Sequence, residues 1–201
     1  MAPSHEPVGQ PVELRTARLL LRQWRDDDRD PFATMNADPA VMEYFPAALD
    51  RATSDAMLDR LRAGLADRGW GLWAVEVLDG GELAGFVGLA PVGDDLPPAP
   101  GVEVGWRLAH EHWGRGYAPE AATRVLRYAF EDLALPEVVS FTTVRNARSR
   151  RVMEKIGLAH DPARDFDHPR TVGWSGQRHV LYAVARGAWL APTGARTCSP
   201  G

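Results

Sequence analysis

Two glycines one residue apart, Gly114 and Gly116, stand between a strand-like run and a strongly periodic helix. Glycine lets the backbone turn tightly, so that successive N–H groups can point into one concavity that binds an anion. A helix that begins directly after such a turn adds unpaired amides and the positive end of its dipole. Pro119 suits the first position of that helix, where its missing N–H costs nothing. The segment predicts a site for an anion such as a diphosphate, with an ordinary tight turn as the alternative.

The run before the turn, residues 102–108, alternates in residue type as a strand does. One face carries the apolar residues Val102, Val104, Trp106 and Leu108. The other face carries Glu103, Gly105 and Arg107. Because glycine within a strand often marks a bulge or a close backbone approach, we expect a bulge at Gly105.

A second helix with polar residues at its start is expected over residues 146–156. Asn146 is a favourable N-cap, Ser149 follows three positions later, and Gly157 ends the helix. By itself this segment can be explained as a capped amphipathic helix with no functional role. Two such motifs, each directly after a strand, favour a shared functional site.

The remaining segments predict a single sheet with helices packed on it. Strands are expected over residues 18–24, 70–78, 82–89, 138–144 and 179–185, and helices over 26–36, 51–67 and 118–133. Asp79-Gly80-Gly81 is a strong hairpin signal between two of these strands. The order favours an α+β fold over a doubly wound one. Residues 1–13 and 187–201 lack periodicity and are expected to be flexible.

Composition excludes several classes of protein. The 201 residues are 45% hydrophobic and 25% charged, which is ordinary for a globular domain. A net charge of −4 gives no footprint for nucleic acid. No apolar run approaches the roughly 20 residues that cross a bilayer, and the first residues do not form a signal peptide. The single cysteine, Cys198, excludes a disulfide framework. We therefore expect a cytoplasmic protein.

Together these segments resemble the GNAT superfamily of N-acetyltransferases, especially its ribosomal-protein-alanine acetyltransferase (RimJ/RimL-type) branch. The resemblance covers residues 14–186 and is carried by residues 19–22, 69–75, 103–106, 113–118 and 146–157. It implies one GNAT acyl-CoA N-acyltransferase domain. The implied fold is a mixed, mostly antiparallel sheet of about seven strands, splayed between the fourth and fifth and flanked by about four helices.

The resemblance also implies acetyl-CoA as co-substrate, without a metal. Pantetheine would lie in the gap between strands 102–108 and 138–144, and the pyrophosphate on the glycine turn. The implied contacts are Val104, Gly105, Trp106, Trp113, Gly114, Arg115, Gly116, Tyr117, Ala118 and Asn146. One departure is Glu111, where the family motif usually has Gln or Arg. The run His110-Glu111-His112 lacks the spacing of metal ligands.

Acyl transfer from a thioester to an amine needs a base, a donor to the carbonyl oxygen and a proton for the leaving thiolate. Glu103 shares a strand face with Gly105 and is expected to take the amine proton, directly or through water. The alternative is a solvated strand carboxylate. Ser149 matches the position of a serine proposed in this branch to protonate the thiol, and otherwise is a hydroxyl at a helix start. A backbone N–H at Val104 or Trp106 could polarise the carbonyl.

The acceptor is expected between residues 38–50 and 159–177. Its candidate contacts are Trp73, Asp165, Phe166 and His168. The acidic residues of the second segment would attract a cationic amine, unless this segment is simply a solvated loop.

The sequence thus predicts acetyl transfer from acetyl-CoA to a primary amine, either a protein N-terminus or a small molecule, by direct attack in a ternary complex. Its partners would be acetyl-CoA and the amine, without nucleic acid or membrane, in a monomer or homodimer. An acyl-CoA-binding module without catalysis is the alternative.

Overall fold

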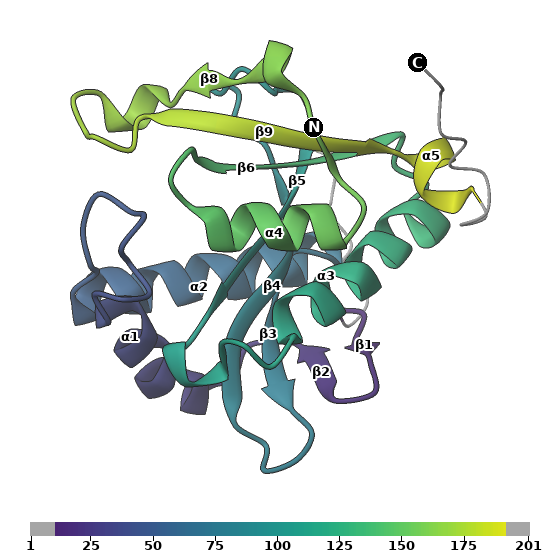
Figure 1. Ribbon diagram of the computed structural model, residues 1–201. Helices are drawn as coiled ribbons and strands as arrows, with labels where there is room; N and C mark the ends of the chain where they lie inside the picture. Colours follow the sequence, from purple (N-terminus) through teal and green to yellow (C-terminus); the bar gives the residue numbers. More distant parts are fainter. Residues whose placement is uncertain (1–10, 192–201) are drawn as a thin grey trace, which may run out of the picture.

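A mixed sheet of nine strands runs through residues 11–191, the part of the chain that the computed structural model describes (Figure 1). Its order is β1-β2-β3-β4-β5-β6-β9-β7, and β8 pairs with β9. The strands are β1 (Leu14–Arg15), β2 (Leu19–Arg22), β3 (Leu72–Val77), β4 (Leu83–Pro91), β5 (Val102–Leu108), β6 (Glu137–Thr143), β7 (Ala159–His160), β8 (Phe166–Asp167) and β9 (Arg178–Ala185). The α+β class is confirmed. The six strands that the residue patterns indicate are all present, and β1, β7 and β8, with two residues each, are too short to show alternation. The total of nine therefore exceeds the seven that the family resemblance implies.

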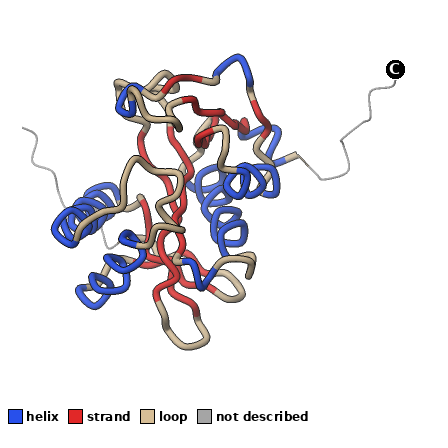
Figure 2. The backbone as a smooth tube through the Cα atoms, turned by 60° about the vertical axis from the view of Figure 1, so that its left-hand side comes forward, coloured by secondary structure: helices blue, strands red, loops and turns tan. Residues whose placement is uncertain are grey.

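Helices cover both sides of the sheet, which occupies the middle of the view in Figure 2. They are α1 (Arg29–Ala37), α2 (Arg51–Arg68), α3 (Tyr117–Arg127), α4 (Ala147–Lys155) and α5 (Arg186–Leu190). The pair α1 and α2 packs together and against β3 and β4, while α3 contacts β4, β5 and α4. Asp50 caps α2 as its type predicts, since its carboxylate accepts a hydrogen bond of 2.8 Å from the Thr53 N–H. Within residues 11–191, no helix combines the length and apolar character needed to cross a membrane.

Helix α3 is fixed by the apolar stripe that the sequence shows. Ala121, Ala122, Val125 and Leu126 are fully buried against the sheet. Val104 on β5 is equally buried, so this strand turns one face to the core. Burying a side chain of the size of Val or Leu contributes about 1.5–3 kcal/mol, so the stripe anchors the start of α3 beside β5.

The sheet opens between β5 and β6, the only parallel neighbours among the strands of residues 11–191. A single pair, Glu103 with Val139, joins them. The strands part beyond Glu103, which confirms the expected splay. The expected bulge at Gly105 is wrong, because β4 and β5 pair without a register shift and place Gly88 opposite Gly105. The irregularity lies between β3 and β4, where Gly85 has a φ of +136°.

The chain beyond residue 186 is more ordered than expected. Helix α5 begins at Arg186, and its Trp189 ring lies 5.5 Å from that of Phe130. The Trp189 indole N–H donates to the Ile156 carbonyl at 3.3 Å. The prediction of a flexible end from residue 187 is therefore wrong for α5. The predictions for residues 1–10 and 192–201 lie outside the described residues.

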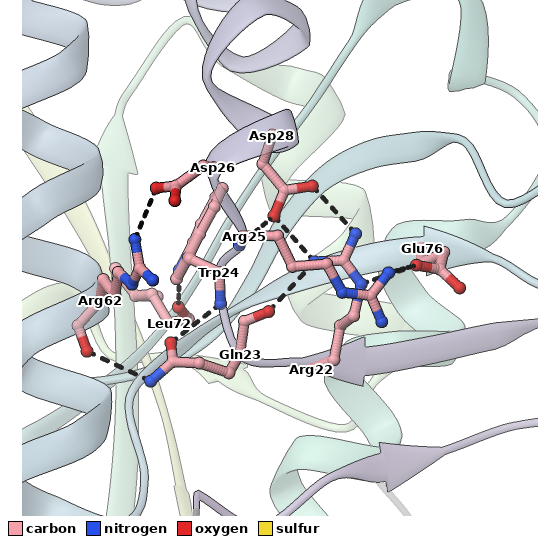
Figure 3. Close-up of polar contacts among 9 residues, drawn as sticks. All are labelled: Arg22, Gln23, Trp24, Arg25, Asp26, Asp28, Arg62, Leu72 and Glu76. Carbon is pink, nitrogen blue, oxygen red and sulfur yellow. Dashed lines mark hydrogen bonds and ion pairs between the residues drawn. The ribbon is translucent and has the colours of Figure 1, made fainter.

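A buried ion-pair network ties β2 and β3 to the entry of α1 (Figure 3). Arg22, only 3% exposed, donates to both oxygens of Asp28 at 2.8 and 2.9 Å and to Glu76 at 2.6 Å. Asp28 also accepts from the Arg25 N–H at 2.7 Å. These partners raise the pKa of Arg22 despite the opposing effect of burial. Asp28, at the entry of α1, is thus one partner of a buried ion pair and does not cap the helix with its side chain.

Replacing Asp28 by Ala is expected to lower the free energy of unfolding by about 3–5 kcal/mol, because it leaves the Arg22 charge buried without its bidentate partner. Urea unfolding measures the loss. The matched control is Asp27→Ala at the exposed neighbouring position, which should change stability by about 0.5 kcal/mol or less. A loss at Asp28 no larger than that at Asp27 would contradict the account.

Candidate functional site

The gap between β5 and β6 is a cleft of about 790 Å³. Its walls are formed by residues 41–46, the open face of β5, the turn 112–119, the β6–α4 region and residues 168–179, with Leu72, Phe86 and Ala90 of β3 and β4. Glu103, Gly105, Trp106, Trp113, Gly114, Gly116, Tyr117, Ala118, Asn146, Ser149 and His168 line it, as the sequence predicts. Val104, also predicted, does not line the cleft, because its side chain is in the core. Arg115 is exposed outside the lining.

The glycine turn at one end of the cleft has the conformation of an anion site. Gly114 and Gly116 have φ values of +75° and +80°, which glycine adopts without strain. Within residues 11–191, no hydrogen bond engages the backbone N–H groups of Gly114, Arg115, Gly116, Tyr117 or Ala118. Helix α3 begins at Tyr117, so the prediction of Pro119 at the first helical position is wrong. Pro119 is third, still among the N–H positions without a helical partner.

Arg18, which the sequence did not single out, braces this turn from β2's side of the sheet. Its Nη1 donates to the Arg115 carbonyl at 2.9 Å, and its Nη2 pairs with Glu120 at 2.5 Å. The guanidinium also lies 4.8 Å from the centre of the Tyr117 ring. Since Arg18 and the turn are about a hundred residues apart, only the fold brings them together. Glu111, the departure from the family motif, is exposed and outside the cleft lining.

The start of α4 borders the cleft opposite the turn. The Asn146 side chain accepts from the Ser149 N–H at 3.1 Å and donates to the Thr142 hydroxyl at 3.1 Å. The predicted cap is therefore confirmed. Because its amide is held from two sides, Asn146 fixes where α4 begins and hence where the Ser149 hydroxyl lies.

Glu103 lies at the closed end of the cleft, where β5 and β6 still pair. Burial raises the pKa of its carboxyl to about 8, opposed by a hydrogen bond from the Phe141 N–H. Glu103 is the one carboxylate in the lining that the described residues provide. A carboxyl with such a pKa can hold or accept a proton near neutral pH.

Three of the four predicted acceptor contacts, Trp73, Asp165 and Phe166, lie outside the cleft lining. Trp73 is fully buried, and its indole N–H donates to the Val12 carbonyl at 2.8 Å. Asp165 accepts from the Leu181 N–H at 2.9 Å and pairs with His160 at 3.0 Å. Phe166 is 5% exposed and packs edge-on against Phe141. These predictions are wrong because β3 turns Trp73 to the core and β8 pairs along β9.

The cleft instead contains aromatic and cationic residues that the sequence analysis did not name, although Tyr44, Phe45 and Trp174 belong to its two predicted acceptor segments. Tyr44 and Phe45 come from the α1–α2 loop, and Trp174 and His179 from the segment at β9. Burial lowers the pKa of His179. Burial also lowers the pKa of His168, and the nearby His179 and Arg170 lower it further. Alternation could have indicated Arg107, which shares a face with Glu103. No periodic pattern marks the loop residues.

Arg148, at the start of α4, connects three walls of the cleft. It pairs with Glu43 at 2.5 Å, and its guanidinium lies 4.5 Å from the Trp113 ring centre and 5.5 Å from that of Tyr44. The pair lowers the pKa of Glu43. Across residues 11–191, no three His, Cys, Asp or Glu side chains gather as metal ligands would. The arrangement therefore combines an anion site, a poised carboxyl and an aromatic-cationic recess.

Comparison with known proteins identifies the family to which this chain is similar. Residues 18–159 match the model described as "Acetyltransferase (GNAT) domain". FsC-acetyl coenzyme A-N(2)-transacetylase of Aspergillus fumigatus is 32% identical over 191 residues, or 90% of this chain and 79% of that relative. The putative ribosomal N-acetyltransferase YdaF of Bacillus subtilis is 36% identical over a shorter stretch of 90 residues, which covers 43% of this chain and 46% of that relative.

Solved structures share the fold. A GNAT-family acetyltransferase from Bacillus anthracis superposes with a TM-score of 0.74 at 22% identity, covering 88% of this chain and 99% of that one. Spermidine N-acetyltransferase from Vibrio cholerae, in complex with CoA and spermine, gives 0.69 at 20% identity, covering 87% and 99%. The fold of this chain is thus the GNAT fold, in which relatives bind CoA. The chain belongs to the GNAT superfamily of acetyltransferases.

Proposed function

We propose that this protein transfers the acetyl group of acetyl-CoA to a primary amine by direct attack in a ternary complex. The observation that carries the proposal is one cleft that joins a turn of unpaired amides to a carboxyl whose pKa is about 8. An anion site alone would suit a binding module. The buried carboxyl at its other end supplies what amine chemistry needs, so the non-catalytic alternative is not favoured.

The glycine turn would hold the pyrophosphate of acetyl-CoA. Its unpaired N–H groups from Gly114 to Ala118 lie at the start of α3, where the helix dipole favours negative charge. Each charge-assisted hydrogen bond contributes about 1.5–3 kcal/mol, so a few such amides could account for much of a micromolar affinity. Trp113 and Asn146 would flank the cofactor, and the open face of β5 at Gly105 would lie beside its pantetheine arm.

Glu103 would act as the general base. The attacking nitrogen must lose a proton, and the carboxylate form of Glu103 can accept it directly or through one water. A pKa near 8 brings the affinity of this carboxyl for protons closer to that of an amine than an ordinary carboxyl would. The backbone N–H of Val104 or Trp106 would polarise the carbonyl that gains charge.

Ser149 would give a proton to the departing thiolate. Its hydroxyl borders the cleft at the first turn of α4, and the cap at Asn146 fixes its place. A proton from this side balances the one that Glu103 takes from the amine. The two groups would lie on opposite walls of the cleft, β5 and α4.

The amine could belong to a protein N-terminus or a small molecule. The relative from Aspergillus fumigatus acts, by its name, at an N(2) position, and the ribosomal branch is favoured only by the shorter match to YdaF. The single cysteine fits a reducing compartment, so we place the protein in the cytoplasm. We expect it to act there as a monomer or a homodimer.

Two measurements on the wild-type protein test the proposal. Acetyl-CoA at 100 times its dissociation constant should stabilise the protein by about 2.7 kcal/mol, or roughly 5–10 °C in Tm for a chain of this size. Release of free CoA thiol should then depend on an amine, in a panel of N-terminal peptides, aminoglycosides, polyamines and amino acids. Absence of a shift would contradict cofactor binding. A shift without thiol release from any amine would support the binding module instead.

A further inference from the structure

Arg107 is a charged residue of the cleft that acetyl transfer does not use. It stands on β5 on the face of Glu103 and Gly105, and it lines the cleft. Within residues 11–191 no carboxylate pairs with it, whereas the similarly placed Arg22 has two. A guanidinium taken out of water without a counter-ion weakens the fold, so its presence in a cleft points to a ligand that supplies the missing charge.

The guanidinium is held in place by neutral groups. Its Nη1 donates to the Asn36 side-chain oxygen at 2.6 Å, and the Asn36 amide donates to the Ser54 hydroxyl at 2.9 Å. Asn36 and Ser54 are fully buried between α1 and α2. The ring centres of Phe45 and Phe86 lie 4.2 and 5.5 Å from the guanidinium carbon. Such fixation orients the charge before any ligand arrives, which reduces the entropy lost on binding.

The remaining donor nitrogens of Arg107 have no hydrogen-bond partner among residues 11–191. Its Nε is buried without a partner, and Nη2 makes no hydrogen bond within residues 11–191. Burial without a counter-ion lowers the pKa of Arg107 to about 10, so the side chain is still charged at neutral pH. A planar carboxylate is the group that guanidinium donors bind best in such a recess, since it supplies both charge and acceptors.

We propose that Arg107 binds a carboxylate carried by the amine acceptor. This inference rests on the proposed acetyl transfer and narrows its acceptor to an amine with an anionic group. Glu103 and Arg107 are four residues apart on one strand face, so their Cα atoms are about 13 Å apart. An acceptor that meets both has its amine and its carboxylate separated by a chain. A polyamine would place a second cation beside Arg107 and is disfavoured.

Two probes that differ by one charge test the inference: 6-aminohexanoate and 6-aminohexanamide. With wild-type protein and acetyl-CoA, KM for the acid should be about 10- to 100-fold lower than for the amide, the range of a charge-assisted hydrogen bond. Arg107→Met keeps the side-chain length and removes the charge, so the two KM values should become equal. The matched control is Arg60→Met at an exposed position of α2, which should keep the preference.

Calorimetric titration of both probes into CoA-saturated protein separates this inference from the proposed function. Tighter binding of the acid, lost in Arg107→Met, would support the Arg107 site even if no acetyl transfer occurred. Transfer to both probes with equal KM and equal Kd in the wild type would overturn the Arg107 site and leave acetyl transfer standing. A preference that persists in Arg107→Met would also overturn it. If Arg107→Met did not fold, equal KM and equal Kd for the acid and the amide in the wild type would still overturn the Arg107 site.

Discussion

Replacing Glu103 by Gln is expected to lower kcat by about 10²-fold or more, the range in which loss of a general base falls. The amide is nearly isosteric and can still occupy the closed end of the cleft, but it cannot accept the amine proton. KM for acetyl-CoA should change little, because the glycine turn lies at the other end of the cleft. Initial rates of thiol release at saturating acetyl-CoA measure the effect. The exposed Glu111 offers the matched control, and Glu111→Gln should keep wild-type turnover.

The pH dependence identifies the role of the carboxyl. With a pKa of about 8, the basic form of Glu103 grows as the pH rises, so the wild-type rate should climb through pH 7 and level off above about 8. In Glu103→Gln that inflection should disappear. A variant whose profile still bends near pH 8 would assign the base to another group.

The same pKa predicts a change in stability with pH. Between the ordinary value of 4.5 and about 8, the folded protein keeps a proton that the unfolded chain has lost. The free energy of unfolding should therefore fall as the pH rises through this interval, and Glu103→Gln should remove that fall. Urea unfolding at pH 5 and pH 9 compares the two proteins without reference to activity.

Local patterns were sufficient to predict the parts of the site that depend on local structure. The alternation of residues 102–108 places Glu103 and Arg107 on one face, and the structure keeps both in the cleft. Asn146 is a cap in the sequence and in the structure, since capping involves residues three apart. The turn at Gly114 and Gly116 follows from the freedom of glycine.

Long-range packing decided what the sequence could not predict. Whether Trp73 faces solvent or core depends on which face of β3 is covered by packing, and its sequence neighbours Leu72 and Ala74 on the opposite face are apolar as well. Asp165 looks like a free acid in the sequence, but β9 provides the Leu181 N–H that it accepts. Arg18 meets the glycine turn only because β2 and α3 pack together. Non-local partners of this kind leave no periodic signal.

At Gly105 one part of the sequence prediction agrees with the structure and another part does not. The sequence indicates a special role for a glycine in a strand, but the expected bulge is absent, and β4 pairs straight across it. A Cβ on Gly105 would meet only the Glu103 carboxyl oxygen, at 3.9 Å, so nothing in the fold requires glycine there. Opposite it, a Cβ on Gly88 would lie 2.0 Å from the Gly71 carbonyl oxygen. The packing reason for glycine therefore belongs to Gly88, whereas at Gly105 the proposed function predicts a close approach of the cofactor from the cleft.

Gly105→Leu is accordingly expected to fold with nearly unchanged stability and to lose acetyl transfer by about 100-fold or more. The new side chain has open space to enter, but that space lies between Glu103 and Arg107, where the thioester and the amine would meet. A displacement of about 1 Å in reacting groups can cost about 10²-fold in rate. Thiol release and urea unfolding, measured on the same preparation, give the two values.

Gly88→Ala is the matched contrast, because it should unfold more readily through its clash with the backbone at Gly71. Two glycines that face each other across one strand pair would then fail in opposite ways, one in activity and one in stability. If Gly105→Leu retained full activity, the open face of β5 could not be where the reactants meet, since a leucine side chain would fill it. If instead it lost stability as Gly88→Ala does, Gly105 would serve packing, and the cleft would owe its shape to the separation of β5 from β6 alone.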